Sequence, residues 1–184
     1  KVVIDNANLS KKIICNSEAS KILLHKKFGV NLNKMVVIYN GVISNRMIRQ
    51  ASEIEKHTCS EKYIIGFVGR IDTNKGIQSL IESMLYLDTD IFELHIIGDG
   101  DLHEEYKRYV NELNINSVKF LGRVKDAWLK ISEFDVMVVP SIREPLGNVV
   151  IEAALQKVPV IASEIDGIPE IIKHQYSGIL IKPS

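Results

Sequence analysis

The sequence has little of what marks a secreted, metal-binding or membrane-spanning protein. Only two of its 184 residues are cysteines, Cys15 and Cys59, and their separation fits no metal-ligand or redox spacing, so reduced thiols are expected. No apolar run approaches the roughly 18 residues that cross a bilayer, and no stretch has the pattern of a signal peptide. The 23 basic and 23 acidic residues cancel, which argues against a global attraction for nucleic acid. The composition predicts a cytoplasmic domain whose binding sites are local.

Apolar strands and amphipathic helices alternate along most of the chain. Ile77, Leu80, Ile81 and Met84, for example, recur at helical spacing. Such alternation predicts an α/β fold, here a Rossmann-like doubly wound parallel sheet of about six strands. The predicted strands lie at 63–68, 93–97, 118–121, 134–140, 158–162 and 178–181, and the predicted helices at 76–87, 102–113, 127–133, 147–156 and 169–173.

The first 62 residues differ in character from the rest. Two short apolar strands are predicted at 12–16 and 35–39, with a helix between them that Ser17 caps. The polar stretch 44–62 has little apolar period and is predicted to be a linker with at most one helical turn. Three parts are therefore expected, namely 1–43, the linker 44–62, and a main domain over 63–184.

Two glutamates, Glu144 and Glu152, stand in the run S-I-R-E-P-L-G-N-V-V-I-E-A-A. The run joins an apolar strand to a helix, and ligands of open parallel sheets bind at such turns, outside the carboxyl ends of the strands. Both carboxylates can face the same side of the start of the helix. The alternative is that each is a solvated surface carboxylate.

The longer stretch E-P-L-G-N-V-V-I-E-A-A-L-Q-K-V-P-V-I-A-S resembles the signature of a known family. This is the group 1 family of retaining, nucleotide-sugar-dependent glycosyltransferases, whose two-domain architecture is called GT-B. The segments K-I-I-C-N-S-E-A-S-K and V-V-I-Y-N-G-V resemble the end of the family's amino-terminal domain and its hinge. The resemblance implies that the chain spans the carboxy-terminal half of such an enzyme and that this half alone is inactive.

The resemblance implies roles for particular residues. Glu144 would contact the donor sugar and Glu152 the ribose hydroxyls, while Arg70 and Lys75, in G-F-V-G-R-I-D-T-N-K-G, would hold the diphosphate. Two cations placed there stabilise negative charge as the diphosphate departs, although both could equally be solvated surface cations. The implied donor-binding set is Gly69, Arg70, Lys75, Arg123, Val124, Leu146, Gly147, Asn148, Val149 and Glu152, with Glu144, Arg70 and Lys75 as its catalytic members.

Several of these assignments leave an alternative open. Arg123 and Val124 form either the floor of the nucleobase site or an ordinary strand-end turn. Ser141 either orients a phosphate or caps its turn. Asp166 stands where relatives often have glycine, so it could select a sugar hydroxyl, adopt a left-handed backbone conformation or face solvent. Glu170 is predicted to lie in the first turn of a helix.

No metal or other cofactor is expected, although two D-x-D motifs are present. Asp88-Thr89-Asp90 falls between a helix and a strand, and Asp99-Gly100-Asp101 begins a helix, where aspartate is a favoured cap. The five histidines show no close ligand spacing.

The predicted activity is hexosyl transfer from a nucleotide diphosphate-sugar, a UDP- or GDP-sugar in preference to an ADP-sugar. The acceptor would be a carbohydrate or a lipid-linked molecule held by the amino-terminal domain, at the inner face of the membrane, in polysaccharide or glycolipid synthesis. A glycosidase is disfavoured because a hydrolase has no use for Arg70 and Lys75. An epimerase, a phosphorylase and a non-catalytic nucleotide-binding module stay open as alternatives.

Overall fold

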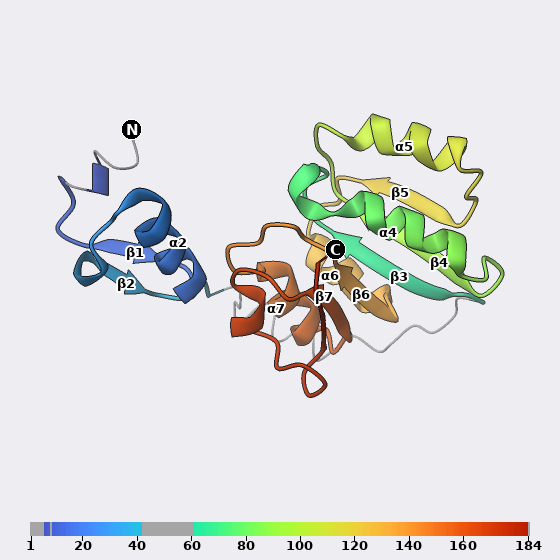
Figure 1. Ribbon diagram of the computed structural model, residues 1–184. Helices are drawn as coiled ribbons and strands as arrows, with labels where there is room; N and C mark the ends of the chain where they lie inside the picture. Colours follow the sequence, from blue (N-terminus) through green and yellow to red (C-terminus); the bar gives the residue numbers. More distant parts are fainter. Residues whose placement is uncertain (1–5, 8, 42–60, 184) are drawn as a thin grey trace.

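The computed structural model describes residues 6–7, 9–41 and 61–183 and contains a small amino-terminal unit and a larger main unit (Figure 1). Apart from residues 61 and 62, the predicted linker at 44–62 lies outside the described residues. No helix among the described residues is long and apolar enough to cross a membrane.

The main unit is built on one six-stranded parallel sheet, as the sequence predicts. Its strands are β3 (Tyr63–Val68), β4 (Phe92–Ile97), β5 (Val118–Gly122), β6 (Val136–Val139), β7 (Val160–Ser163) and β8 (Ile179–Ile181). Their order in the sheet is β5-β4-β3-β6-β7-β8. The chain winds outward from β3 in one direction and then from β6 in the other, so the strand order reverses between β3 and β6. This is the switch point at which open α/β sheets bind ligands.

Helices cover both faces of this sheet, because strands buried on both sides need apolar partners on each. On one face lie α4 (Ile77–Ser83), continued by η3 (Met84–Tyr86), and α5 (His103–Glu112). The other face packs against α6 (Ala127–Lys130), η4 (Ile131–Glu133) and α7 (Asn148–Leu155). In β3, Ile65 and Phe67 belong to the hydrophobic core on the α4 and α5 side of the sheet, whereas Ile64 and Val68 pack against the core on the α7 side.

The amino-terminal unit is a single strand–helix–strand element. It contains β1 (Ile13–Cys15), α2 (Glu18–Phe28), η1 (Leu32–Lys34) and β2 (Met35–Val37), and β1 pairs with β2 in parallel. Ser17 caps α2 by accepting a hydrogen bond from the Ser20 N–H, as predicted. A small core that includes Cys15, Val30 and Met35 holds the element together.

The predicted helix at 169–173 is wrong. The structure has only one 3₁₀ turn there, η5 (Ile168–Glu170). The helix cannot continue because the Lys173 N–H donates to Ser177 Oγ, in the turn that leads the chain into β8.

Candidate functional site

The loops after β3 and β6 meet at the switch point and bring two predicted residues together. Lys75 ends the 3₁₀ turn η2 (Thr73–Lys75), and its Nζ lies 2.6 Å from Oε2 of Glu144. The side chain of Glu144 is only 11% exposed and that of Lys75 is 23% exposed. Buried Ser141 lies 3.5 Å from the same carboxylate oxygen. Charge-assisted hydrogen bonds of this kind are short and strong, so the pair fixes both side chains.

The backbone on both sides of Glu144 is held from the loop after β7. The Glu144 N–H donates to Oδ2 of Asp166, and the Gly167 N–H donates to the Glu144 carbonyl. Asp166 has φ of 42°, so it adopts the left-handed conformation that is one of the predicted alternatives. Gly167 packs against the loop so closely that a Cβ there would lie 2.2 Å from the carbonyl oxygen of Pro145. Asp166 therefore supports Glu144 through the backbone.

A cavity of about 340 Å³ opens beside the Lys75–Glu144 pair. Its wall includes the start of α7, whose N-cap residue, Gly147, has a left-handed backbone and provides no side-chain cap. The N–H groups of an uncapped first turn have no partner within the helix and favour anions. The predicted residues that line this cavity are Gly69, Lys75, Glu144, Leu146, Gly147, Asn148, Val149 and Glu152.

Glu152 lines the same cavity from the second turn of α7, so both glutamates face one space, as predicted. Burial raises the pKa of Glu152 above its ordinary value. Within the described parts of the chain, its carboxylate has no hydrogen-bond or ion-pair partner. A carboxylate that is partly desolvated and unpaired is an acceptor for hydroxyl groups.

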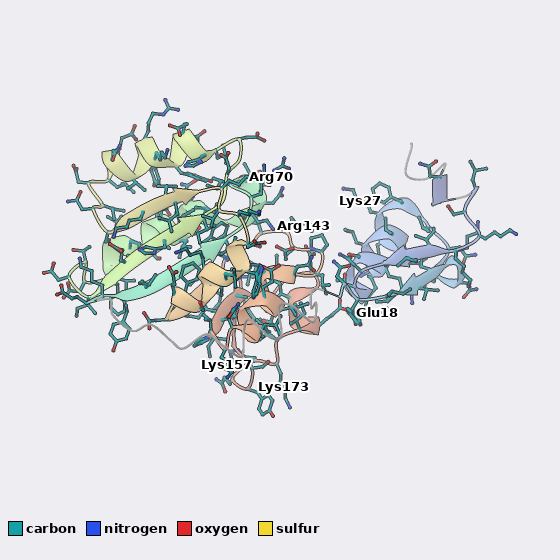
Figure 2. The ribbon with its side chains drawn as sticks, turned by 180° about the vertical axis from the view of Figure 1, so that it is seen from behind. Glu18, Lys27, Arg70, Arg143, Lys157 and Lys173 are labelled. Carbon is teal, nitrogen blue, oxygen red and sulfur yellow. The ribbon has the colours of Figure 1, made fainter. Side chains whose placement is uncertain are left out.

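A second cavity, of about 450 Å³, adjoins the first and shares Val68 and Gly69 with it. Arg70, Arg123 and Val124 line it. Arg70 is exposed and lies on the side of the main unit that is turned toward the amino-terminal unit (Figure 2). The two predicted phosphate-binding cations are thus in neighbouring cavities rather than in one, on either side of Gly69.

The aspartates of the two D-x-D motifs make turns. Oδ1 of Asp88 accepts from the Asp90 N–H, and Oδ1 of Asp99 accepts from the Gly100 N–H and lies 3.0 Å from Nδ1 of His103. Among the residues that the structure describes, no group of three or more His, Cys, Asp or Glu side chains is placed to hold a metal ion.

The predicted set leaves out four residues that line the first cavity, namely Asn16, Asn40, Val68 and Pro145. Asn16 and Asn40 come from the amino-terminal unit. Glu170 lies in the first turn of η5, and its carboxylate also accepts from the backbone N–H groups of Glu18 and Ala19 in α2, a contact that was not predicted. The available signal in the sequence was that Asn16 ends one predicted strand and Asn40 directly follows the next.

The sequence and the fold both match known glycosyltransferases. The chain is 34% identical over 186 residues to an uncharacterized glycosyltransferase, MJ1607, of Methanocaldococcus jannaschii, an alignment that covers 95% of this chain and 47% of that protein. It is 29% identical over 185 residues to the capsular polysaccharide biosynthesis glycosyltransferase CapM of Staphylococcus aureus, covering 92% and 48%. The chain spans about half the length of the curated relatives it matches.

Among solved structures, Anabaena Alr3699/HepE in complex with UDP-glucose superposes with a TM-score of 0.84 at 26% identity, and the same protein in complex with UDP and glucose superposes with a TM-score of 0.83 at 25% identity. The UDP-glucose complex covers 99% of this chain and 53% of that one. The six-stranded sheet is that of the Rossmann-like domains of GT-B enzymes. The sequence pattern of the family described as "Glycosyl transferases group 1" matches residues 49–184. The chain therefore belongs to the group 1 family of glycosyl transferases.

Proposed function

We propose that this chain forms the donor-binding half of an enzyme that transfers a sugar from a nucleoside diphosphate sugar to an acceptor, with retention at the anomeric carbon. One observation carries the proposal. A paired Lys75 and Glu144 and an unpaired Glu152 line a single cavity at the switch point of a parallel sheet. A donor that offers negative charge and several hydroxyl groups in one molecule complements this set.

The two adjoining cavities divide the donor between them. The first takes the sugar, the diphosphate and the ribose, and the second, beside Arg123 and Val124, takes the base. The shared Gly69 leaves room for the backbone to approach the ligand where the two cavities meet.

Lys75 and Arg70 act on the leaving diphosphate. The Lys75 ammonium has three donors and one is used by Glu144, so two are available to phosphate oxygens. Arg70 reaches the diphosphate from the adjoining cavity with its planar guanidinium group, which can bind two oxygens at once. Cations held there stabilise the charge that develops on the leaving oxygen, which makes a divalent metal unnecessary in this proposal.

The two glutamates bind the two sugars of the donor. Glu144, fixed by Lys75 and by the Asp166 loop, contacts the transferred sugar and stabilises the oxocarbenium-like charge of the transition state. Glu152 accepts hydrogen bonds from the ribose hydroxyls, since it lies in the same cavity without a partner of its own among the described residues.

A UDP-hexose is the proposed donor. The solved structures of Alr3699/HepE contain UDP, UDP with glucose, or UDP-glucose. The proposed acceptor is a growing polysaccharide or glycolipid, because the similar proteins include enzymes of capsular polysaccharide and of lipopolysaccharide core biosynthesis. The cytoplasmic location stays a prediction from composition.

Calorimetric titration of the full chain with UDP, GDP, ADP and UMP, without metal and then with magnesium, tests the donor site. UDP is expected to bind at least about tenfold more tightly than UMP without magnesium, a difference of about 1.4 kcal/mol. Equal affinities for UDP and UMP would contradict the diphosphate assignment. With the full-length enzyme, the anomeric configuration of the product, measured by NMR, tests retention and separates transfer from epimerisation.

A further inference from the structure

Two asparagines of the amino-terminal unit form part of the wall of the first cavity. Asn16 directly follows β1, and Asn40 lies three residues after β2. Because β1 and β2 are parallel, their carboxyl ends point to the same edge of the small sheet. That edge faces the main unit at the cavity, so a second structural unit supplies side chains to the site.

The Asn16 amide is held in one orientation. Its Oδ1 accepts a hydrogen bond of 2.9 Å from Oγ of Ser20, in the first turn of α2. The Nδ2 group then points away from that bond. In the described part of the chain, Nδ2 meets no hydrogen-bond acceptor, so both of its hydrogens are available to a ligand.

The neighbours of Asn16 place it at the Glu144 end of the cavity. Ser17, the next residue, donates through Oγ to the carbonyl oxygen of Pro145 at 2.5 Å, and Pro145 follows Glu144 directly. Asn40 marks the other end, since its Nδ2 donates to Oδ1 of Asn148, the first residue of α7.

The Glu144 end of the cavity therefore combines an amide donor with a carboxylate acceptor. Oε2 of Glu144 binds Lys75 and lies near Ser141, while Oε1 has no partner among the described residues. A hydroxyl group both accepts and donates one hydrogen bond, whereas a phosphate oxygen only accepts. The donor–acceptor pair therefore matches a sugar hydroxyl better than a phosphate.

We propose that Asn16 binds the transferred sugar, donating from Nδ2 to a sugar hydroxyl whose own hydrogen goes to Glu144. This inference rests on the proposed function and extends it to a residue outside the main unit. It makes the amino-terminal unit a part of the sugar-selecting surface.

Glu170 acts through Asn16 as a positioning residue. Its Oε2 accepts from the Glu18 N–H at 2.9 Å and from the Tyr39 hydroxyl at 2.8 Å, and its Oε1 accepts from the Ala19 N–H at 2.8 Å. These donors belong to the first turn of α2 and to the segment after β2, immediately beside Asn16 and Asn40. One carboxylate of the main unit thus fixes the segments that carry both asparagines.

The test compares the binding of UDP-glucose and UDP by calorimetry in the full chain. The Asn16→Ala variant is expected to lose about tenfold in affinity for UDP-glucose, the size of one lost hydrogen bond, and to bind UDP as the wild type does. Asn33→Ala is the matched control, because Asn33 is exposed in the same unit and does not line the cavity. Equal losses for both ligands, or no loss for either, would overturn the assignment of Asn16.

A double-mutant cycle tests the role of Glu170. Glu170→Ala alone is expected to weaken UDP-glucose binding and spare UDP, and to cost nothing further when Asn16 is already alanine. Additive losses would overturn the positioning role. If the wild type binds neither UDP nor UDP-glucose, the proposed function itself fails, whereas wild-type binding with an unaffected Asn16→Ala variant rejects only the contact with Asn16.

Discussion

Nζ of Lys75 and Oε2 of Glu144 lie 2.6 Å apart, although 69 residues separate them in the chain. Lys75 follows β3 and Glu144 follows β6, the two strands that flank the switch point. The pair therefore joins the two halves of the doubly wound sheet at the point where the donor is proposed to bind, and it links the integrity of the site to that of the fold.

Removing Lys75 tests this pair. Lys75→Ala leaves a carboxylate that is 11% exposed without its cation, so we expect a loss of about 2 kcal/mol in the free energy of unfolding, together with weaker UDP binding. Lys107→Ala is the control, because Lys107 and Glu104 form an ion pair of 2.9 Å on the exposed face of α5. That variant should change stability by less than about 0.5 kcal/mol. Urea unfolding of both variants makes the comparison, and equal effects would contradict the role given to Lys75.

The pKa of Glu152 gives the binding of the donor a pH dependence. Burial raises this pKa, so the free protein becomes protonated at Glu152 at a higher pH than an exposed glutamate would. Ribose hydroxyls need the ionised acceptor, and affinity for UDP-glucose should therefore fall as the pH is lowered from neutral toward the ordinary glutamate pKa of 4.5. UDP-glucose is the suitable ligand because its diphosphate, unlike that of UDP, has no terminal phosphate to titrate in this range.

Glu152→Gln should flatten that profile and weaken binding at neutral pH. A raised pKa means that the ionised form is disfavoured in the folded protein, so the cost to stability is present above the folded pKa and disappears as the pH falls. The neutral glutamine variant is therefore expected to be more stable than the wild type at neutral pH. Thermal unfolding at neutral and acidic pH measures this, and a less stable variant at neutral pH would show that Glu152 has a structural partner.

Gly167→Ala should disturb the Glu144 loop through the backbone of Pro145 and Leu146, which line the first cavity. A Cβ at residue 167 would lie 2.2 Å from the Pro145 carbonyl oxygen and 2.8 Å from the Leu146 Cα, and neither backbone atom can move independently of Glu144. We expect a loss of about 1–3 kcal/mol in the free energy of unfolding and weaker UDP-glucose binding. Gly41→Ala is the control, since a Cβ there meets nothing within 4 Å. A variant at Gly167 with wild-type stability would show that the two loops separate freely.

The hydrogen bonds that the Glu170 carboxylate accepts predict a loss of stability in acid. Partial burial acts to raise its pKa, but the N–H groups of Ala19 and Glu18 and the Tyr39 hydroxyl outweigh that effect and hold the pKa below its ordinary value of 4.5. Because the pKa is lower in the folded protein than in the unfolded chain, Glu170 stabilises the fold at pH values above 4.5. This stabilisation is lost as the pH falls through the pKa of the folded protein. Because Glu170 is exposed, the contribution should not exceed about 1 kcal/mol. Wild type and Glu170→Ala should therefore differ in thermal stability at pH 7 and converge in acid, and a constant difference would contradict this assignment.

The sequence by itself determined the parallel α/β fold, the positions of its strands to within a few residues, and the loops that carry Glu144 and Lys75. These features depend on local periodicity and on the rule that the carboxyl ends of parallel strands meet at one edge. The sequence also predicted that Glu144 and Glu152 face the same space, because the short turn and first helical turns between them determine their relative positions. The predicted helix at 169–173 failed because the turn that leads into β8 takes the Lys173 N–H.

Only the tertiary structure decided which partners these residues meet. The bond between Lys75 and Glu144 depends on β3 and β6 being neighbours, an order that no local pattern encodes. The contact of Ser17 with Pro145 spans 128 residues and brings Asn16 into the cavity, and Glu170 binds α2 across a similar separation. Local propensity acts over a few residues, whereas these contacts arise from the packing of helices and strands that have already formed. The site is therefore assembled only in the folded chain.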